Sequence, residues 1–194
     1  MLNGFISWGD LSAAFDIVDH DLLMLRPERQ FGIHGVALQW FRSYLLGRSY
    51  RVIYGGSMSA MVYVVCSVPQ GSVLGPRLFI MYTADLSEVV KKRCKHSRIR
   101  EQHTIVLYRH CLRTETVATV ERLERCLLDV SHWMSANRIT LNPDKTKLLW
   151  SGSTYSQSLL GSSCLSLQLD SDTIIASDNV RVLGVTFSCD LSLD

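Results

Sequence analysis

The chain has 194 residues, of which 47% are hydrophobic and 20% are charged. This length and composition suit one folded domain, or one domain and a fragment, and exclude a disordered tail. A formal charge of +2 does not by itself indicate nucleic-acid binding. The apolar runs are shorter than the ~20 residues of a membrane span, and no signal segment precedes the first strand, so we expect an intracellular protein, cytoplasmic or nuclear, without a membrane partner.

The chain begins with a pattern typical of a buried strand. Residues 5–8 are aromatic-rich and lead directly to Asp10, which would lie at the strand's tip. A helix capped by Asp19 or Asp21 should follow. Pro27 is expected to weaken or end that helix, because proline lacks the N–H group that a helix interior uses.

A second helix and a hairpin are predicted next. Apolar residues recur at three-to-four spacing over 36–45, which indicates a helix with one buried face. Residues 50–54 and 61–65 then read as strands on either side of a turn at 55–59, and strands so close in sequence favour a hairpin.

The remaining elements alternate helices and strands. Leu74 to Val89 predicts one helix, and residues 114–137 predict a longer one. Strands are expected at 147–150, 165–169 and 180–187. The longer helix has a single apolar stripe, formed by Val117, Val120, Leu123, Leu127, Val130 and Met134.

These elements predict a mixed α+β fold. We divide the chain into residues 1–150 and a Ser/Gly-rich connection with further strands over 151–194, both within the same domain. No internal repeat is present.

Four segments carry a resemblance to a known family: Gly9-Asp10-Leu11-Ser12-Ala13-Ala14-Phe15-Asp16, Ser67-Val68-Pro69-Gln70-Gly71-Ser72, Leu74-Gly75-Pro76 and Leu141-Asn142-Pro143-Asp144-Lys145-Thr146. In this order they resemble the reverse transcriptases of LINE-type (non-LTR) retrotransposons. The resemblance extends from Asp10 to about Asp190. It implies a polymerase palm-type α+β fold, with an antiparallel sheet, helices packed on one face of it and partial fingers. It also implies a truncated and degenerate copy of that domain, and an ancestral activity of RNA-templated DNA synthesis on an RNA template and a DNA primer.

The resemblance also implies a metal site at Asp10. Nucleotidyl transfer uses two divalent cations ~3.5–4 Å apart, and Mg²⁺ prefers oxygen ligands. Asp10 would be the first metal ligand and Leu11 would lend its backbone carbonyl. The ring of Phe15 would screen the 2′ position of the sugar, and Asp16 would be structural. By itself, an aspartate after a strand is more often a turn residue.

Three further residues take roles from the same resemblance. Gln70 would hydrogen-bond to nucleic acid, and Gly71 would let the backbone approach the template–nucleotide pair. Lys145 would lie near the triphosphate as a catalytic group that protonates the leaving pyrophosphate.

The chain departs from the family at one decisive place. Alignment on Thr104 puts Gln102 and His103 where the family has paired aspartates, and Glu101 is out of register. Glutamine is neutral and histidine is a poor Mg²⁺ ligand, so the second cation lacks its anionic anchor. We therefore predict that the rate of nucleotidyl transfer falls by ~10³ to 10⁴ or more. The resemblance to the family stops abruptly over residues 98–103 and returns at Thr104. This suggests the hypothesis that two small insertions or deletions, each compensating the other, changed the reading frame over this stretch.

Three functions remain open: an active reverse transcriptase, a nucleic-acid-binding module without catalysis, and a host interaction protein. Six basic residues between Lys91 and Arg100 would suit the second function, although such a run is more often a solvated loop or helix end.

The six cysteines are expected to be reduced. A histidine and cysteine cluster between Cys94 and Cys111 matches no usual zinc spacing, and we interpret it as accidental.

Overall fold

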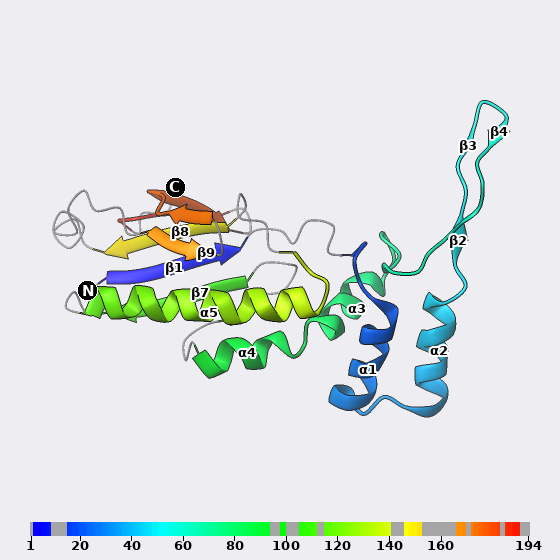
Figure 1. Ribbon diagram of the computed structural model, residues 1–194, viewed down its shortest axis with the longest axis horizontal. Helices are drawn as coiled ribbons and strands as arrows, with labels where there is room; N and C mark the ends of the chain where they lie inside the picture. Colours follow the sequence, from blue (N-terminus) through cyan, green and yellow to red (C-terminus); the bar gives the residue numbers. More distant parts are fainter. Residues whose placement is uncertain are drawn as a thin grey trace. The chain divides into compact units, whose positions relative to one another are not determined.

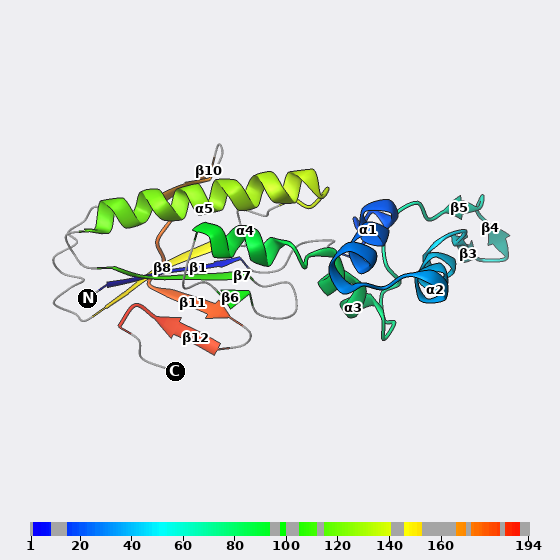
Figure 2. The ribbon, with the colours of Figure 1, turned by 90° about the horizontal axis from the view of Figure 1, so that it is seen from below.

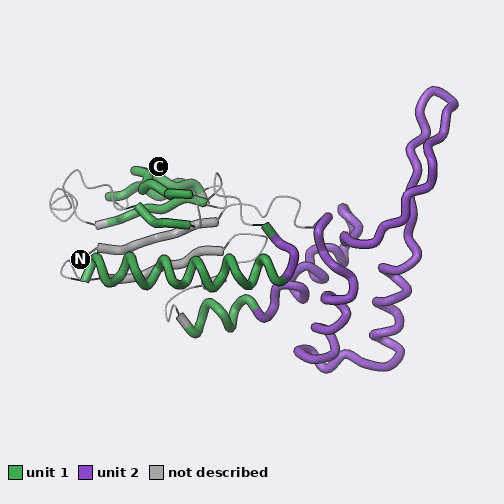
Figure 3. Tube along the Cα trace, viewed as in Figure 1, with its two compact units in different colours: residues 1–12, 86–136, 140–194 green, residues 13–85, 137–139 purple. Residues whose placement is uncertain are grey.

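The computed structural model describes residues 2–8, 15–93, 98–99, 105–111, 115–140, 146–152, 166–169, 172–182 and 185–190. The chain forms two compact units (Figure 3). Unit 1 consists of residues 1–12, 86–136 and 140–194, and unit 2 of residues 13–85 and 137–139. Residues before and after position 150 belong to unit 1, and the subdivision at that position stays a prediction.

Unit 1 is built on a four-stranded antiparallel sheet in the order β6–β7–β1–β8. Its strands are β1 (Leu2–Trp8), β6 (Arg98–Ile99), β7 (Ile105–Cys111) and β8 (Thr146–Gly152). β1 is central and is paired along its whole length on both sides. The two strands predicted at the places of β1 and β8 are confirmed, and both are longer than predicted.

Two helices of unit 1, α4 (Leu86–Arg93) and α5 (Thr116–Ala136), lie side by side, and in Figure 1 both lie below the sheet; Figure 2 shows the same pair from below. The long helix predicted over 114–137 is confirmed. Its buried face passes through Thr116 and Thr119, whereas Val117 is 72% exposed. Val117 is one position, about 100° around the helix, away from the buried Thr116.

The predicted helix over 74–89 is wrong, because the chain forms α3 (Gly75–Tyr82) and α4 with a break between them. At the break, Thr83 has φ −102° and ψ 8°. Its backbone N–H and its hydroxyl both donate to the Phe79 carbonyl, each at 3.0 Å. A side chain that bonds back to the preceding turn competes with the regular helical ladder.

β8 lies in the core of unit 1. Leu148, Leu149 and Trp150 are consecutive and all buried, so both faces of the strand are covered. Leu149 packs against Val180, with Phe187 beside them.

The last strands of unit 1 form two antiparallel pairs. β9 (Ser166–Leu169) pairs with β10 (Asp172–Ile175), and β11 (Asn179–Val182) pairs with β12 (Val185–Ser188). The strand predicted at 165–169 is confirmed as β9, whereas β10 was not predicted. The single strand predicted over 180–187 is wrong, because Val182 pairs with Val185 and the chain reverses between them. The apolar run continues through the reversal and conceals it.

Unit 2 contains α1 (His20–Phe31), whose N-cap is Asp19 as predicted. The Leu22 N–H donates to Asp19 Oδ1 at 2.9 Å. Pro27 does not end the helix, which continues to Phe31 and is capped by Gly32 with φ 64°. Whether the proline weakens the helix stays a prediction. Proline removes one donor from the helical hydrogen bonds, but its carbonyl still accepts from the N–H groups of Gly32 and the next residue.

The described part of the chain has no helix with the length and apolarity to cross a bilayer.

The second helix and the hairpin of unit 2 are confirmed. α2 is Gly35–Leu45. The hairpin contains two short pairs, β2 (Ser49–Tyr50) with β5 (Val62–Tyr63), and β3 (Ile53–Tyr54) with β4 (Ser57–Met58). The turn is shorter than predicted. It consists of Gly55 and Gly56, whose φ values of 55° and 77° suit a two-residue hairpin turn.

Candidate functional site

The predicted site residues divide into two groups. Asp10, Leu11, Gln102, His103 and Lys145 lie outside the described residues, so their roles stay predictions. Phe15, Gln70 and Gly71 are described, and all three belong to unit 2.

Three strand ends meet at one end of the sheet in unit 1. Trp8, the last residue of β1, pairs with Ile105, the first residue of β7. On its other side Trp8 pairs with Thr146, the first residue of β8. The register therefore aligns the end of one strand with the beginnings of its two neighbours.

The predicted catalytic positions are sequence neighbours of these strand ends. Asp10 follows β1 by two positions, His103 precedes β7 by two positions, and Lys145 directly precedes β8. A single end of the sheet is thus the point from which all three segments depart.

In unit 2, the segment after Asp10 is joined to the segment that contains Gln70. The Val68 N–H donates to the Phe15 carbonyl at 2.8 Å, and the Ser67 N–H donates to the Val18 carbonyl at 2.8 Å. The ring of Phe15 lies 5.6 Å from that of Phe79, tilted by 59°. Two motifs about fifty positions apart are therefore joined by backbone bonds, and the first of them also contacts α3 through the Phe15 ring.

The Gln70 side chain is held within this arrangement. Its Nε2 donates to Asp16 Oδ1 at 2.8 Å. The next residue, Gly71, has φ 73°, a backbone conformation that residues with a side chain rarely adopt. The carboxylate therefore orients the amide, and the glycine permits the turn that follows it.

Gly75 is a site residue that the sequence analysis quoted but did not single out. A Cβ at this position would lie 3.0 Å from the Pro69 carbonyl oxygen and 3.8 Å from Phe15 Cε1. The Gly75 N–H donates to Ser72 Oγ at 3.0 Å, and that hydroxyl donates to the Pro69 carbonyl at 2.7 Å. A side chain at Gly75 would therefore crowd the Pro69 carbonyl, whereas its distance to the Phe15 ring would be an ordinary contact.

A buried polar network closes unit 2. Arg26 donates to the Tyr82 carbonyl and to Asn137 Oδ1, and it forms an ion pair with Asp85 at 3.2 Å. The Tyr82 hydroxyl donates to the Asn137 carbonyl at 2.6 Å. Burial raises the pKa of Tyr82 above its ordinary value of 10.0, so the hydroxyl remains a donor at neutral pH.

The neighbouring residue Arg138 continues this network at the surface. Its guanidinium lies 2.6 Å from Asp19 Oδ2, and the other carboxylate oxygen of Asp19 caps α1. No motif in the sequence predicted the network, because its members are far apart along the chain.

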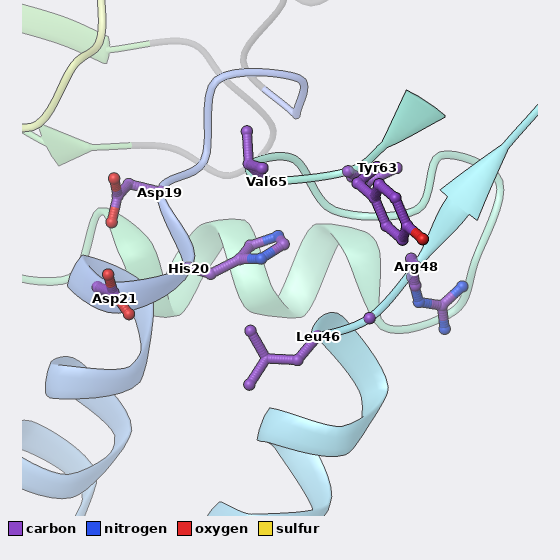
Figure 4. Close-up of a pocket in the computed structure, with 9 residues that line it drawn as sticks. Asp19, His20, Asp21, Leu46, Arg48, Tyr63 and Val65 are labelled. Atoms are coloured by element: carbon purple, nitrogen blue, oxygen red, sulfur yellow. The ribbon is translucent and has the colours of Figure 1, made fainter. Parts of the chain in front are cut away.

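Unit 2 also has a cavity of about 300 Å³ (Figure 4). His20 and Leu46 point into it, while Tyr63 and Arg48 lie near each other at its rim. The His20 ring is fixed by a hydrogen bond of 2.7 Å between Nε2 and the Ser67 carbonyl. The cavity is lined by Asp19, His20, Asp21, Leu46, Gly47, Arg48, Tyr63, Val64 and Val65.

Comparison with known proteins gives consistent matches. Residues 3–187 match the model of the family described as reverse transcriptase (RNA-dependent DNA polymerase). The chain is 35% identical over 77 residues to the RNA-directed DNA polymerase from mobile element jockey of Drosophila funebris. It is 37% identical over 84 residues to the probable RNA-directed DNA polymerase from transposon X-element of Drosophila melanogaster. These matches cover 40% and 41% of the chain, and only 8% of each relative's length.

A solved structure agrees with the fold. The chain superimposes with a TM-score of 0.66 on a structure titled apo telomerase from Candida tropicalis truncated from the C-terminal domain, at 14% sequence identity. The match covers 100% of this chain and 35% of the other. The predicted α+β polymerase-type fold is confirmed.

Proposed function

Since the chain belongs to the reverse transcriptase (RNA-dependent DNA polymerase) family, as the resemblance to LINE-type elements predicted, we propose that it binds an RNA template and a DNA primer without polymerising. The observation that carries this proposal is the junction in unit 2 that joins the Phe15 segment to the Gln70 loop. In the proposed complex, Gln70 and Gly71 face the template–nucleotide pair and Phe15 lies beside the sugar.

The donor set argues against metal-dependent catalysis. Two Mg²⁺ ions need several oxygen ligands, and carboxylates are the usual protein donors. The three segments that leave the end of the sheet contribute Asp10, the pair Gln102 and His103, and Lys145. With Glu101 out of register, only one carboxylate takes its family position, so these residues do not fit a pair of magnesium ions.

The remaining family residues keep binding roles in this proposal. Asp10 and the carbonyl of Leu11 are left as a weak, single-cation site at most. Lys145 supplies one positive charge for the phosphates, and without the metal pair its catalytic role as a proton donor has no reaction to serve.

A primer-extension assay with an RNA template, a DNA primer and Mg²⁺ tests the catalytic half of the proposal. We expect no incorporation by the unmodified chain. The double substitution Gln102→Asp and His103→Asp restores the paired carboxylates. Its nucleotide incorporation is compared with that of the unmodified chain. Template-directed incorporation by the unmodified chain, abolished by Asp10→Ala, would overturn the proposal.

Binding of an RNA–DNA hybrid tests the other half. We expect measurable affinity that falls as salt rises, because phosphate contacts release counterions. Gln70→Ala should weaken binding, whereas Gln30→Ala, an exposed glutamine near the end of α1, should not. Affinity that is independent of salt, or equally affected by both substitutions, would contradict a template-binding role.

A further inference from the structure

The hairpin of unit 2 has two outer edges without a partner strand. In the part of the chain that the structure describes, β2 pairs only with β5, and β3 pairs only with β4. The hairpin extends away from the helices of unit 2 (Figure 1), and every residue from 49 to 63 is exposed. The N–H and C=O groups that point outward along each edge are therefore accessible to a further strand.

The hydrogen bonds of the hairpin show which backbone groups point outward. The Val64 N–H donates to the Arg48 carbonyl at 2.9 Å. In an antiparallel pair of strands, residues that exchange hydrogen bonds alternate with residues that do not. The next pair along the hairpin, Ser49 with Tyr63, is therefore one that does not. The N–H and C=O groups of Tyr63 thus point away from β2, toward the open edge of β5.

The two edges differ in charge. Residues 57–65, which contain β4 and β5, include no charged residue, no proline and no glycine. The first strand of the hairpin contains Arg51 and directly follows Arg48. Natural sheets usually protect a free edge with charged side chains or proline. Of the two edges, the one formed by residues 57–65 lacks this protection.

The register restricts pairing to the β5 part of this edge. Ile53 pairs with Met58 and Tyr50 pairs with Val62, so three residues, 59–61, lie opposite two, 51 and 52. An extra residue of this kind bends the strand and interrupts the regular ladder. A further strand can therefore pair with β5 and the residues next to it, which are residues 61–65.

We propose that a second copy of the chain pairs with this edge, so that residues 61–65 of two copies form an antiparallel pair with Tyr63 at a two-fold axis. At the axis, the Tyr63 N–H of each copy donates to the Tyr63 carbonyl of the other copy. Val62 then lies opposite Val64, and Met61 lies opposite Val65. The two hairpins together form one four-stranded sheet.

Symmetry and charge select a second copy as the occupant. An antiparallel strand pair around a two-fold axis is self-complementary, because the same residues of both copies supply the donors and the acceptors. The residues that meet are valine, tyrosine and methionine, and none of them is charged. Pairing of two copies through the other edge would bring arginines from both copies together, which is unfavourable for neighbouring strands.

Pairing would also cover exposed apolar side chains. Met61, Tyr63 and Val65 alternate along the strand and are 46%, 67% and 80% exposed. Two strands of this length bury less than the ~1,200 Å² of a standard interface, so we expect weak and reversible association. Dimerisation of this kind is independent of the proposed nucleic-acid-binding function.

Sedimentation velocity of the full chain tests the association. Protein concentrations from about 1 μM to about 1 mM cover weak affinities, and we expect a reversible shift from monomer to dimer over this range. Val65→Lys should raise the dissociation constant by about 2- to 30-fold, the range for the two Met61–Val65 pairs that the dimer loses. Val52→Lys adds the same charge to the other strand, at a position that is 61% exposed, and should leave the dissociation constant unchanged.

Disulfide formation tests the position of the axis. In a hydrogen-bonded antiparallel pair the Cα atoms are about 5.5 Å apart, which a disulfide can span. Tyr63→Cys should therefore give a covalent dimer under mild oxidation. Tyr54→Cys, at the hairpin tip where the tyrosine is 86% exposed, should not. The unmodified chain is oxidised in parallel, because it has six cysteines of its own, and circular dichroism checks that both variants are folded.

Three results would overturn the proposed dimer: a monomer at every concentration, equal effects of Val65→Lys and Val52→Lys, or equal cross-linking of Tyr63→Cys and Tyr54→Cys. A monomer at every concentration would leave the edge of β5 to a strand of another protein. The proposed function is tested separately, by hybrid binding that depends on Gln70. A monomer that binds the hybrid would reject only the dimer, and a dimer that does not bind it would reject only the proposed function.

Discussion

β8 in unit 1 and the hairpin in unit 2 are made of similar residues and have opposite environments. In β8, Leu148 and Leu149 are 0% and 2% exposed. In the hairpin, Val52 and Ile53 are 61% and 66% exposed. Apolar strand sequence therefore does not decide burial, which depends on the elements that cover the strand. β8 has β1 and β11 as neighbours, whereas the hairpin strands pair only with each other among the described residues.

The two units also differ in the interactions of their interiors. Unit 1 is packed through buried apolar residues of α5 and β8, and unit 2 also contains the buried polar network around Arg26. The following substitutions test whether these differences in burial are also differences in stability.

The largest effect should come from Leu148→Ala. We expect it to lower the free energy of unfolding by about 2–5 kcal/mol, because it leaves a cavity in a packed core. Val52→Ala in the hairpin should change it by less than about 0.5 kcal/mol, since that side chain is already hydrated. Urea denaturation followed by circular dichroism measures both. Similar losses would mean that the hairpin is covered in solution, which contradicts the contrast with β8.

A smaller effect is expected for Arg26→Met. The methionine keeps most of the apolar volume but leaves the Tyr82 carbonyl and the Asn137 side chain without their buried donor, at a cost of about 1–3 kcal/mol. Arg29→Met, on the exposed side of the same helix, should cost less than about 0.5 kcal/mol. The same denaturation experiment compares them. An equal cost for both would show that the polar network does not stabilise unit 2.

The smallest effect should appear at high pH. Burial raises the pKa of Tyr82 above 10.0, so the unfolded chain releases this proton at a lower pH than the folded chain does. The corresponding stability is present below pH 10 and is lost as the pH rises through the folded-state pKa. Tyr82→Phe should be less stable at neutral pH, because it lacks the hydrogen bond to Asn137, and should lose less stability above pH 10. Parallel pH profiles of the two proteins would contradict this.

The sequence predicted the elements that depend on local pattern. α2, α5 and β8 have strong periodicity or long apolar runs, and they were placed within a few residues. The break at Thr83 and the reversal after Val182 were missed, because apolar patterning continues through both. Pro27 was expected to weaken or end α1, because the pattern alone does not show that the Pro27 carbonyl accepts hydrogen bonds from the turn at Gly32.

The candidate site was predictable only in part. Phe15, Gln70 and Gly71 were chosen from the family resemblance, and the structure joins their two motifs in unit 2. The cavity and the Arg26 network were not predictable, since each depends on contacts between distant positions. Arg26 and Asn137, for example, are 111 positions apart.

That separation sets an order of events during synthesis on the ribosome. Residues 13–85 leave the ribosome long before Asn137 and Arg138, the residues that complete the bonds to Arg26, Tyr82 and Asp19. At a translation rate of about 5–20 residues per second, the nascent unit waits on the order of seconds with Arg26 lacking its Asn137 acceptor. β1 waits as well, because both of its partners, β7 and β8, are made later. The first strand of the chain is therefore among the last to be fully paired, and a nascent chain halted before residue 137 would carry both units unfinished.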